Sequence, residues 1–287
     1  MIPNNNLNIL PFYDSIEEQN HRKYYAYGEV YTLIAPNNRI LPFQINRETS
    51  ASTISFASVV NLKTNVVTDI LQELNNSGLN IKSFASEGYD LIINSGAFLF
   101  SSLQLDAGQY FLQISDTTNT WYSDVFTVVS DLSPFLKIEY WDSDNIAYSG
   151  GHVDYSSPFK NYCYVQSEIG KPEYPFQETA QERDGHLFIE KQISEKKYKF
   201  TFIAPEFLCD ALRITRMHDY IKIYSKGKKY DVENIIFDVK WQDQGDIAVV
   251  EVEFECDTVI KKIGKGIYSD ESSQGDFNND FNNDFNK

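Results

Sequence analysis

The sequence predicts a mainly β protein, in which an N-terminal immunoglobulin-like β-sandwich precedes a strand-rich domain with one main helix. Aromatic residues make up 15% of the chain, with 20 Phe and 19 Tyr, and such side chains fit the pleated, half-buried surface of a sheet. Short apolar runs are separated by turn residues at strand-like spacing. In residues 250–256, apolar side chains alternate with glutamates, which places one face of a strand in a core and the other in water.

The N-terminal sandwich domain is predicted to span residues 1–130. From residue 52 to residue 129, strand-like runs alternate with turn sequences, a pattern typical of a small sandwich. Residues 109–115 and 121–129 flank a polar turn and are predicted to form the closing hairpin. Residues 130–134 contain a proline between two apolar runs and are predicted to link the two domains.

The second domain is predicted to cover residues 131–268. Its strands include 135–141, 161–166 and 197–203, and two hairpins are expected to turn at 226–228 and 243–246. Pro205 suits the first position of a helix, and the apolar spacing after it predicts the main helix near 205–215. The polar, acidic residues 172–185 are predicted to form a long excursion loop, a candidate element of assembly.

Residues 269–287 form a low-complexity acidic tail, in which Asp-Phe-Asn-Asn repeats with a period of four. Asn and Asp are poor helix formers and the segment has too little apolar surface for a core, so the tail is expected to be disordered in isolation. Such segments can order on contact with a partner, which makes Phe277, Phe281 and Phe285 candidate docking anchors. The alternative is an inert tail that keeps the protein in solution.

The formal net charge of −16 and the pI of about 4.6 bear on the class of partner. So acidic a chain repels phosphate backbones and anionic lipid surfaces, and neither nucleic-acid binding nor membrane binding is expected. No run approaches the roughly 18 apolar residues of a membrane-spanning helix. Residues 1–6 lack the basic and apolar regions of a targeting peptide, so folding in a cytoplasm is expected.

The chain carries no nucleophile-elbow, metalloprotease, P-loop or dinucleotide-binding motif, and we expect neither enzymatic activity nor a cofactor. His186 and His218 lie beside aspartates and are candidates for acid–base chemistry, against surface or capping roles. The three cysteines lie far apart in apolar surroundings, which favours buried thiols over a disulfide or a zinc site. Residues 142–145 and the tail resemble calcium loops but lack ligands, so a plain turn and a disordered tail are favoured.

Exposed aromatic side chains can form a platform for sugars. Trp121 and Tyr122, near the tip of the predicted closing hairpin, are the best candidates for such a glycan contact. The competing interpretation is that they pack in the core or within the hairpin. The corresponding alternative function is a β-sandwich module that binds a glycan or a host receptor.

Four segments carry a family resemblance: residues 8–13, 21–28 and 41–45, and the closing Asp-Phe-Asn-Asn repeats. They resemble structural proteins of phages and prophages of gut Bacteroidetes. The order of strand, helix and two hairpins from Lys197 to Cys256 is also similar to the tube-forming domain of long-tailed phages. Distal tail proteins share this arrangement and carry a second β-sandwich domain.

The resemblance implies a virion structural protein, assembled in the cytoplasm of a bacterial host. It would form a homo-oligomeric ring in a tail or baseplate, in contact with neighbouring virion proteins. An acidic surface facing a channel would repel passing DNA and prevent it from sticking. The resemblance supplies no catalytic, cofactor or metal residues.

Overall fold

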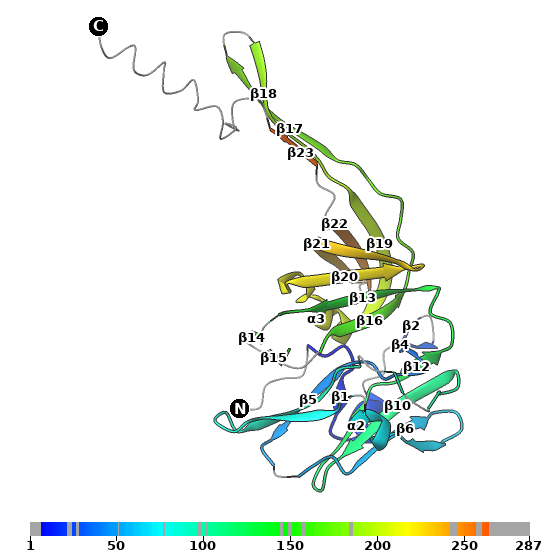
Figure 1. Ribbon diagram of the computed structural model, residues 1–287. Helices are drawn as coiled ribbons and strands as arrows, with labels where there is room; N and C mark the ends of the chain where they lie inside the picture. The colour runs from blue at the N-terminus through cyan, green and yellow to red at the C-terminus, as the bar shows by residue number, and fades with distance from the viewer. Residues whose placement is uncertain are drawn as a thin grey trace.

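The computed structural model describes residues 7–21, 25–26, 29–50, 52–76, 78–96, 99–100, 103–143, 146–148, 151–155, 159–183, 186–241, 246–256 and 260–263. Strands account for 55% and helices for 10%, so the predicted mainly β fold is confirmed. Figure 1 shows a β-sandwich at one end, a second sheet beside it, and a narrow ribbon that projects from that sheet. The predicted tail, residues 269–287, lies outside the described residues.

The N-terminal half is built from a seven-stranded and a three-stranded sheet. The larger has the order β1 (Phe12–Tyr13), β11 (Thr120–Ser123), β10 (Gly108–Ser115), β12 (Phe126–Val129) and β4 (Leu33–Pro36), with β6 (Phe56–Asn61) and β7 (Val67–Asp69) branching from β10. The smaller contains β5 (Phe43–Glu48), β9 (Tyr89–Asn94) and β8 (Asn80–Phe84). The helices α1 (Ile16–His21) and α2 (Leu71–Asn76) and the hairpin of β2 (Tyr25–Ala26) and β3 (Glu29–Val30) accompany the sheets.

The predicted closing hairpin is present, but its second arm, predicted as residues 121–129, is divided into β11 and β12, which both pair with β10. Tyr110, Leu112 and Ile114 alternate into the core on one face of β10. Asp116 fixes the turn, because its Oδ1 accepts hydrogen bonds of 2.7 Å from the backbone N–H groups of Thr118 and Asn119. Its other carboxylate oxygen accepts a 2.6 Å hydrogen bond from Arg47 on β5, which ties the turn to the smaller sheet.

The second half is a six-stranded antiparallel sheet in the order β16 (Asn161–Gln166), β13 (Phe135–Trp141), β20 (Tyr220–Ser225), β21 (Lys228–Trp241), β22 (Ile247–Cys256) and β19 (Lys197–Pro205). A small hairpin of β14 (Ile146–Tyr148) and β15 (Gly151–Val153) follows β13. The strands of both predicted hairpins pair as expected, although residues 242–245 of the second turn lie outside the described residues. The first turns on Lys226 and Gly227, whose φ angles of 49° and 76° are those that a type I′ turn requires.

The predicted main helix is α3 (Glu206–Leu212), and the 3-10 turn η1 (Thr215–Met217) follows it. Leu208, Ala211 and Leu212 are buried against the inner face of the six-stranded sheet. The strands supply Ile223, Ile235, Val250 and other apolar side chains to that face. The alternate residues of these strands form the outer face, which points away from α3.

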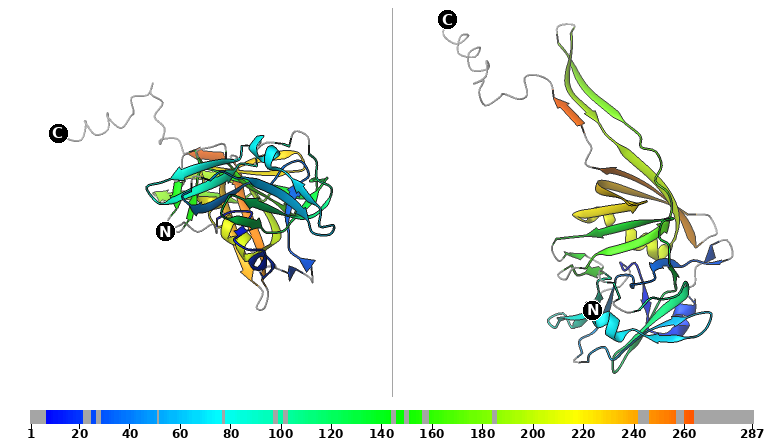
Figure 2. Two further views of the ribbon diagram at one scale, coloured as in Figure 1. Left: turned by 90° about the horizontal axis from the view of Figure 1, so that it is seen from below. Right: turned by 45° about the vertical axis from the view of Figure 1, so that its right-hand side comes forward.

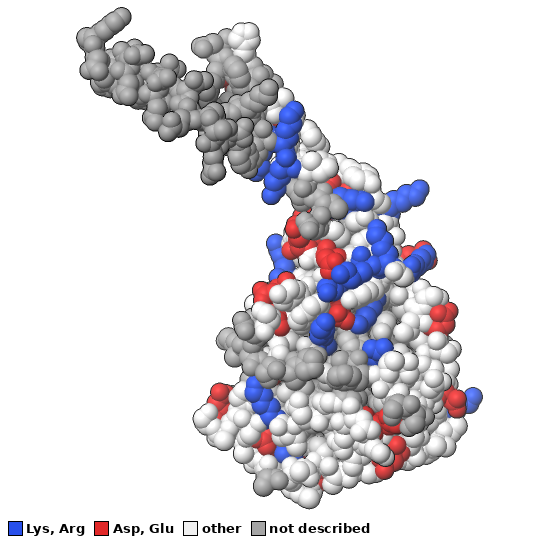
Figure 3. Space-filling model, in the orientation of Figure 1, with Lys and Arg blue, Asp and Glu red and all other residues white. Residues whose placement is uncertain are grey.

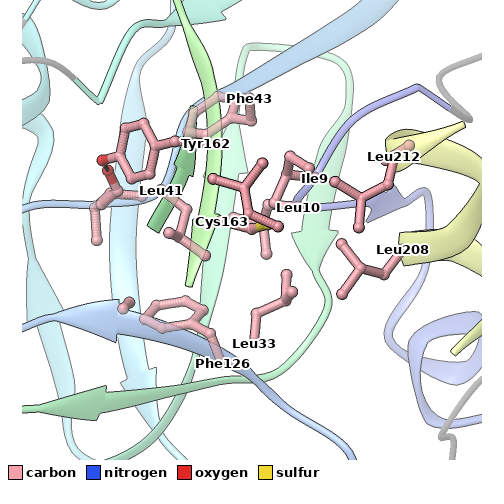
Figure 4. Packing of buried hydrophobic residues seen from close by; sticks show 14 of the residues in the cluster. Ile9, Leu10, Leu33, Leu41, Phe43, Phe126, Tyr162, Cys163, Leu208 and Leu212 are labelled. Atoms are coloured by element: carbon pink, nitrogen blue, oxygen red, sulfur yellow. Dashed lines mark hydrogen bonds between the residues drawn. The ribbon is translucent and has the colours of Figure 1, made fainter. Parts of the chain in front are cut away.

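One hydrophobic core runs through both halves of the molecule. Figure 4 shows Leu33, Phe43 and Phe126 of the sandwich near Cys163 of β16 and Leu208 of α3. Polar contacts cross the same junction. The Tyr162 hydroxyl donates a 2.9 Å hydrogen bond to the Gly96 carbonyl, and the Gln44 side chain bonds both backbone groups of Asp154, at 2.7 and 2.9 Å. The chain passes from one half to the other at residues 130–134.

The interpretation of residues 172–185 as an excursion loop is wrong. β17 (Phe176–Arg183) pairs with β18 (His186–Ser194), and β23 (Ile260–Ile263) adds a third strand along β18. Polar residues occupy both faces of β17. The segment therefore lacks the alternation by which a half-buried strand is recognised in a sequence.

Candidate functional site

The first candidate surface is the ribbon formed by β17, β18 and β23. Figures 1 and 2 show from different directions that it extends away from the six-stranded sheet. Every described side chain of β17 is exposed, so nothing in the described part of the chain covers either face of that strand. Narrow ribbons without a packed face are marginally stable in water. This ribbon therefore has the exposure expected of an element that packs on another molecule.

Large apolar side chains are exposed on the ribbon. Phe176 is 61% exposed, Ile189 43% and Ile260 71%. Phe176 and Ile260 both lie in register with Ser194, one on each side of β18. Directly paired residues share a face of a sheet, so these two apolar side chains flank one position on the same face. Apolar surface gathered in this way marks an interaction surface.

The base of the ribbon is firmly attached to the six-stranded sheet. Lys197 and Glu173 exchange two backbone hydrogen bonds, of 2.9 and 3.0 Å. The Lys197 ammonium lies 2.8 Å from Glu255 and 3.3 Å from Glu253 on β22. Hydrogen bonds to these carboxylates raise the pKa of Lys197 despite partial burial. The ribbon is therefore held in a defined direction rather than attached by a flexible link.

The second candidate surface lies on the outer face of the six-stranded sheet. Trp141 of β13 and Tyr220 of β20 are cross-strand neighbours, and their rings stack with centroids 5.1 Å apart at an angle of 13°. Tyr220 is 45% exposed, whereas Trp141 is half-buried and packs in part against the hydrophobic core. The ammonium groups of Lys160 and Lys222 lie 3.9 and 4.7 Å from the Trp141 ring centroid, within the range of cation–π attraction.

Two further lysines extend this surface. Lys137 of β13 lies 4.3 Å from the ring centroid of Tyr162 and pairs with Glu139. Burial lowers the pKa of Lys137, although Glu139 opposes that effect. Lys229 lies 2.8 Å from Asp231. Figure 3 shows the basic side chains gathered over this sheet, and we call the set the lysine–aromatic face: Lys137, Trp141, Lys160, Tyr220, Lys222 and Lys229.

The lysine–aromatic face has an excess of positive charge. Glu139 and Asp231 are the carboxylates paired with its four lysines. At the other end of the outer face, the glutamates of β22 pair with lysines of β19 and β21, as Glu251 does with Lys240 at 2.6 Å. One sheet face therefore carries a basic aromatic end and an acidic, internally paired end.

His218, a sequence candidate for acid–base chemistry, belongs to a buried cluster. Its Nε2 lies 2.6 Å from the Tyr155 hydroxyl and 3.8 Å from Asp142, and its Nδ1 lies 2.8 Å from the Ile214 carbonyl. The side chains of His218 and Asp142 are 0% exposed, so neither faces an incoming substrate. Asp142 also accepts a 2.8 Å hydrogen bond from the backbone N–H of Asp219 and joins the turn after β13 to the start of β20.

The two candidate glycan residues, Trp121 and Tyr122, do not form an exposed aromatic platform. Trp121 is 4% exposed and belongs to the hydrophobic core, so it offers no ring face to a sugar. Tyr122 is half-buried, with its ring 6.4 Å from that of Phe111. The core and hairpin-packing interpretation therefore describes both residues. The docking candidates Phe277, Phe281 and Phe285 lie outside the described residues.

The remaining sequence candidates are His186, the three cysteines and the candidate calcium turn. His186 is exposed beside the turn of the ribbon, in register with Arg183. Cys163 is buried as predicted, and burial raises the pKa of its thiol to about 12. Cys209 and Cys256 are half-buried rather than buried, and none of the three cysteines forms a disulfide. Residues 144–145 of the candidate calcium turn lie outside the described part of the chain.

Sequence reasoning did not identify the lysine–aromatic face. Its signal is the interleaving of basic and aromatic residues in 137–141 and 220–224, two segments far apart in the chain. Each segment taken alone is an ordinary strand. They become one surface only because β13 and β20 are neighbours in the sheet.

Within the described ranges, no three His, Cys, Asp or Glu side chains gather as metal ligands would. No helix in this part of the chain has the length and apolar character needed to cross a membrane. Comparison with protein-family models, curated proteins and solved structures gave no match.

Proposed function

We propose that the protein is a structural subunit that assembles with copies of itself into a ring, as a tail or baseplate component of a phage particle. The observation that carries the self-assembly is the ribbon, which is anchored at its base and exposed on both faces of β17. The phage context comes from the sequence resemblance of residues 8–13, 21–28 and 41–45 and of the closing repeats.

The direction of the ribbon supports a contact between different surfaces of successive copies. It extends beyond the body of its own subunit (Figure 2), and we propose that it packs on the body of the next copy rather than on that copy's ribbon. Such head-to-tail contacts close into rings when the rotation between copies divides a full turn, and otherwise produce filaments. Covering Phe176, Ile189 and Ile260 removes apolar surface from water and favours the assembled state.

The alternative function, a module that binds a glycan or host receptor, has weaker support. It rested on Trp121, whose ring is buried in the core. The second candidate, Tyr122, is half-buried with its ring beside that of Phe111, and we do not propose this function.

Light scattering coupled to size-exclusion chromatography, with electron microscopy of the same fractions, tests the proposal. The full chain is expected to form closed rings. The double substitution Phe176→Asp and Ile189→Asp should weaken self-association by about tenfold or more, because charge replaces apolar surface at the contact. Gln177→Asp with Gln181→Asp is the matched control: it adds the same charges on the same ribbon at exposed polar positions.

The control variant should assemble as the natural chain does, within about twofold. Circular dichroism of every variant verifies that the sheet structure is retained. A natural chain that remains monomeric at the highest attainable concentration contradicts the proposal. Equal loss of assembly in both double variants contradicts it as well, because the effect would then be one of charge alone.

A further inference from the structure

The lysine–aromatic face is unusual for so acidic a protein. Lys160 and Lys222 flank the stacked rings of the half-buried Trp141 and the exposed Tyr220, and Lys137 and Lys229 lie farther along the same face, in a chain whose formal net charge is −16. Glu139 and Asp231 balance only part of this local charge. Such a face fits an occupant that is acidic and carries aromatic or apolar side chains.

We propose that the lysine–aromatic face is the docking site for residues 269–287 of this chain, supplied by a neighbouring copy. That segment contains Asp270, Glu271, Asp276, Asp280 and Asp284 against the single Lys287. An aspartate directly precedes each of Phe277, Phe281 and Phe285. The segment therefore presents paired acidic and aromatic groups to lysines and to stacked rings.

The repeat period suits a one-sided contact. Residues four apart lie on the same side of a strand, and also on the same side of a helix. The three phenylalanines therefore face one way in either conformation. Aromatic rings pack favourably against Trp and Tyr rings, and the preceding aspartates lie within reach of long lysine side chains. Segments that order on binding use short anchors of this kind.

The course of β23 favours a neighbouring copy as the source of the segment. Ile260 lies in register with Ser194, close to the sheet, and Ile263 with Lys191, farther along the ribbon. The chain therefore runs outward along the ribbon and away from its own lysine–aromatic face. Residues 264–287 can span up to about 80 Å when fully extended. That length suffices to cross an adjacent subunit.

Fluorescence anisotropy with a labelled synthetic peptide of residues 269–287 tests the docking directly. The receptor is the full chain carrying Phe277→Ser, Phe281→Ser and Phe285→Ser, so that its own tail has no aromatic anchors. The peptide is expected to bind this chain, and its affinity should fall as salt is added, because salt screens exposed charges. A peptide with the same three serines should bind at least about tenfold more weakly.

Matched substitutions in the receptor locate the site. Trp141→Ala and, separately, Lys222→Glu should each weaken peptide binding by about tenfold. Trp241→Ala is the control for the ring. Trp241 is 48% exposed and lies in register with the buried Ala248, hence on the opposite face of the sheet from Trp141. Lys63→Glu, at an exposed position of the sandwich, is the control for charge. In both control variants the affinity for the peptide should stay within about twofold of its value in the unsubstituted receptor.

Three results would overturn the inference. The first is absence of peptide binding, and the second is an equal effect of Trp141→Ala and Trp241→Ala. The third is tighter binding of a single-stranded oligothymidylate than of the peptide, lost on Trp141→Ala, because lysines and exposed rings also suit single-stranded nucleic acid.

The inference rests on the proposed self-assembly for the source of the tail, and the two can fail separately. Rings that form while the peptide does not bind the face overturn only the inference. A chain that never assembles, yet binds the peptide in the expected pattern, overturns the proposed function and the neighbouring copy as source. The docking site itself would then be occupied by the chain's own tail.

Discussion

The Tyr155 hydroxyl oxygen lies 2.6 Å from Nε2 of His218, in a cluster beneath the turn between β13 and β14. The Ile214 carbonyl, 2.8 Å from Nδ1, can only accept a hydrogen bond, so the ring donates from Nδ1. The neutral ring then accepts at Nε2 from Tyr155, and Asn161 donates to the same hydroxyl at 3.3 Å. The cluster is therefore arranged around an uncharged imidazole.

This arrangement predicts a loss of stability in mild acid. Burial lowers the pKa of His218 from its ordinary value of 6.5, although the Asp142 carboxylate opposes the shift. The unfolded chain therefore binds a proton more readily than the folded one. The stabilising contribution is complete above the ordinary pKa and is lost as the pH falls towards the lower folded value. Urea unfolding at about pH 7.5 and about pH 5 should show a smaller free energy of unfolding at the lower pH.

His218→Asn is the variant that assigns this effect. Its amide can still donate to the Ile214 carbonyl, but it does not titrate. The variant should be less stable near neutral pH and should lose less stability between the two pH values. An unchanged pH dependence would show that another group is responsible.

Arg47 provides a second test, because it lies between two buried carboxylates. Its guanidinium is 2.6 Å from Asp116 and 3.3 Å from Asp90, and none of these side chains is more than 2% exposed. Burial alone would raise the pKa of Asp116, but the N–H groups of Asn119 and Thr118 and the Arg47 guanidinium outweigh it, so that pKa lies below its usual range. Arg47→Ala leaves both charges buried and should cost about 3–5 kcal/mol of unfolding free energy.

Arg213→Ala is the matched control for Arg47→Ala. Arg213 pairs with Asp210 at 3.5 Å, but its side chain is 64% exposed. Exposed ion pairs contribute at most about 1 kcal/mol. Similar losses in the two variants, measured by urea unfolding at one pH, would contradict the role given to burial.

The predictions that succeeded from sequence are those in which one face of an element is buried. Residues 250–256 and the start of α3 could be placed because their apolar residues recur with a regular period. β17 has no buried face, so its sequence carries no such period, and the ribbon was mistaken for a loop. The exposure that makes the ribbon a candidate for assembly is the same property that concealed it.

The site residues were harder to place, for two different reasons. Trp121 adjoins a hairpin turn, and only its register opposite Ile114 shows that it points into the core. Trp141 and Tyr220 lie on strands separated by most of the second half. Their pairing depends on β20 being placed beside β13, which no local pattern encodes.

Gly96 gives a test of the junction between the two halves. Its φ of +58° is a left-handed conformation, and an added Cβ would lie 2.8 Å from the Ile40 carbonyl oxygen and 2.9 Å from the Tyr162 hydroxyl. Gly96→Ala should therefore cost the backbone strain of about 1–2 kcal/mol and displace the tyrosine that bonds the Gly96 carbonyl. The loss of that buried hydrogen bond adds about 1–3 kcal/mol.

Gly88→Ala separates the steric effect from the backbone effect. Gly88 also has a positive φ, of +81°, but an added Cβ there would meet nothing within 4 Å. The stability lost in Gly88→Ala should be limited to the backbone strain of about 1–2 kcal/mol. Thermal and urea unfolding should therefore give Gly96→Ala a clearly lower free energy of unfolding than Gly88→Ala. Equal stability of the two would mean that the contact between Gly96 and Tyr162 is not what holds the two halves together.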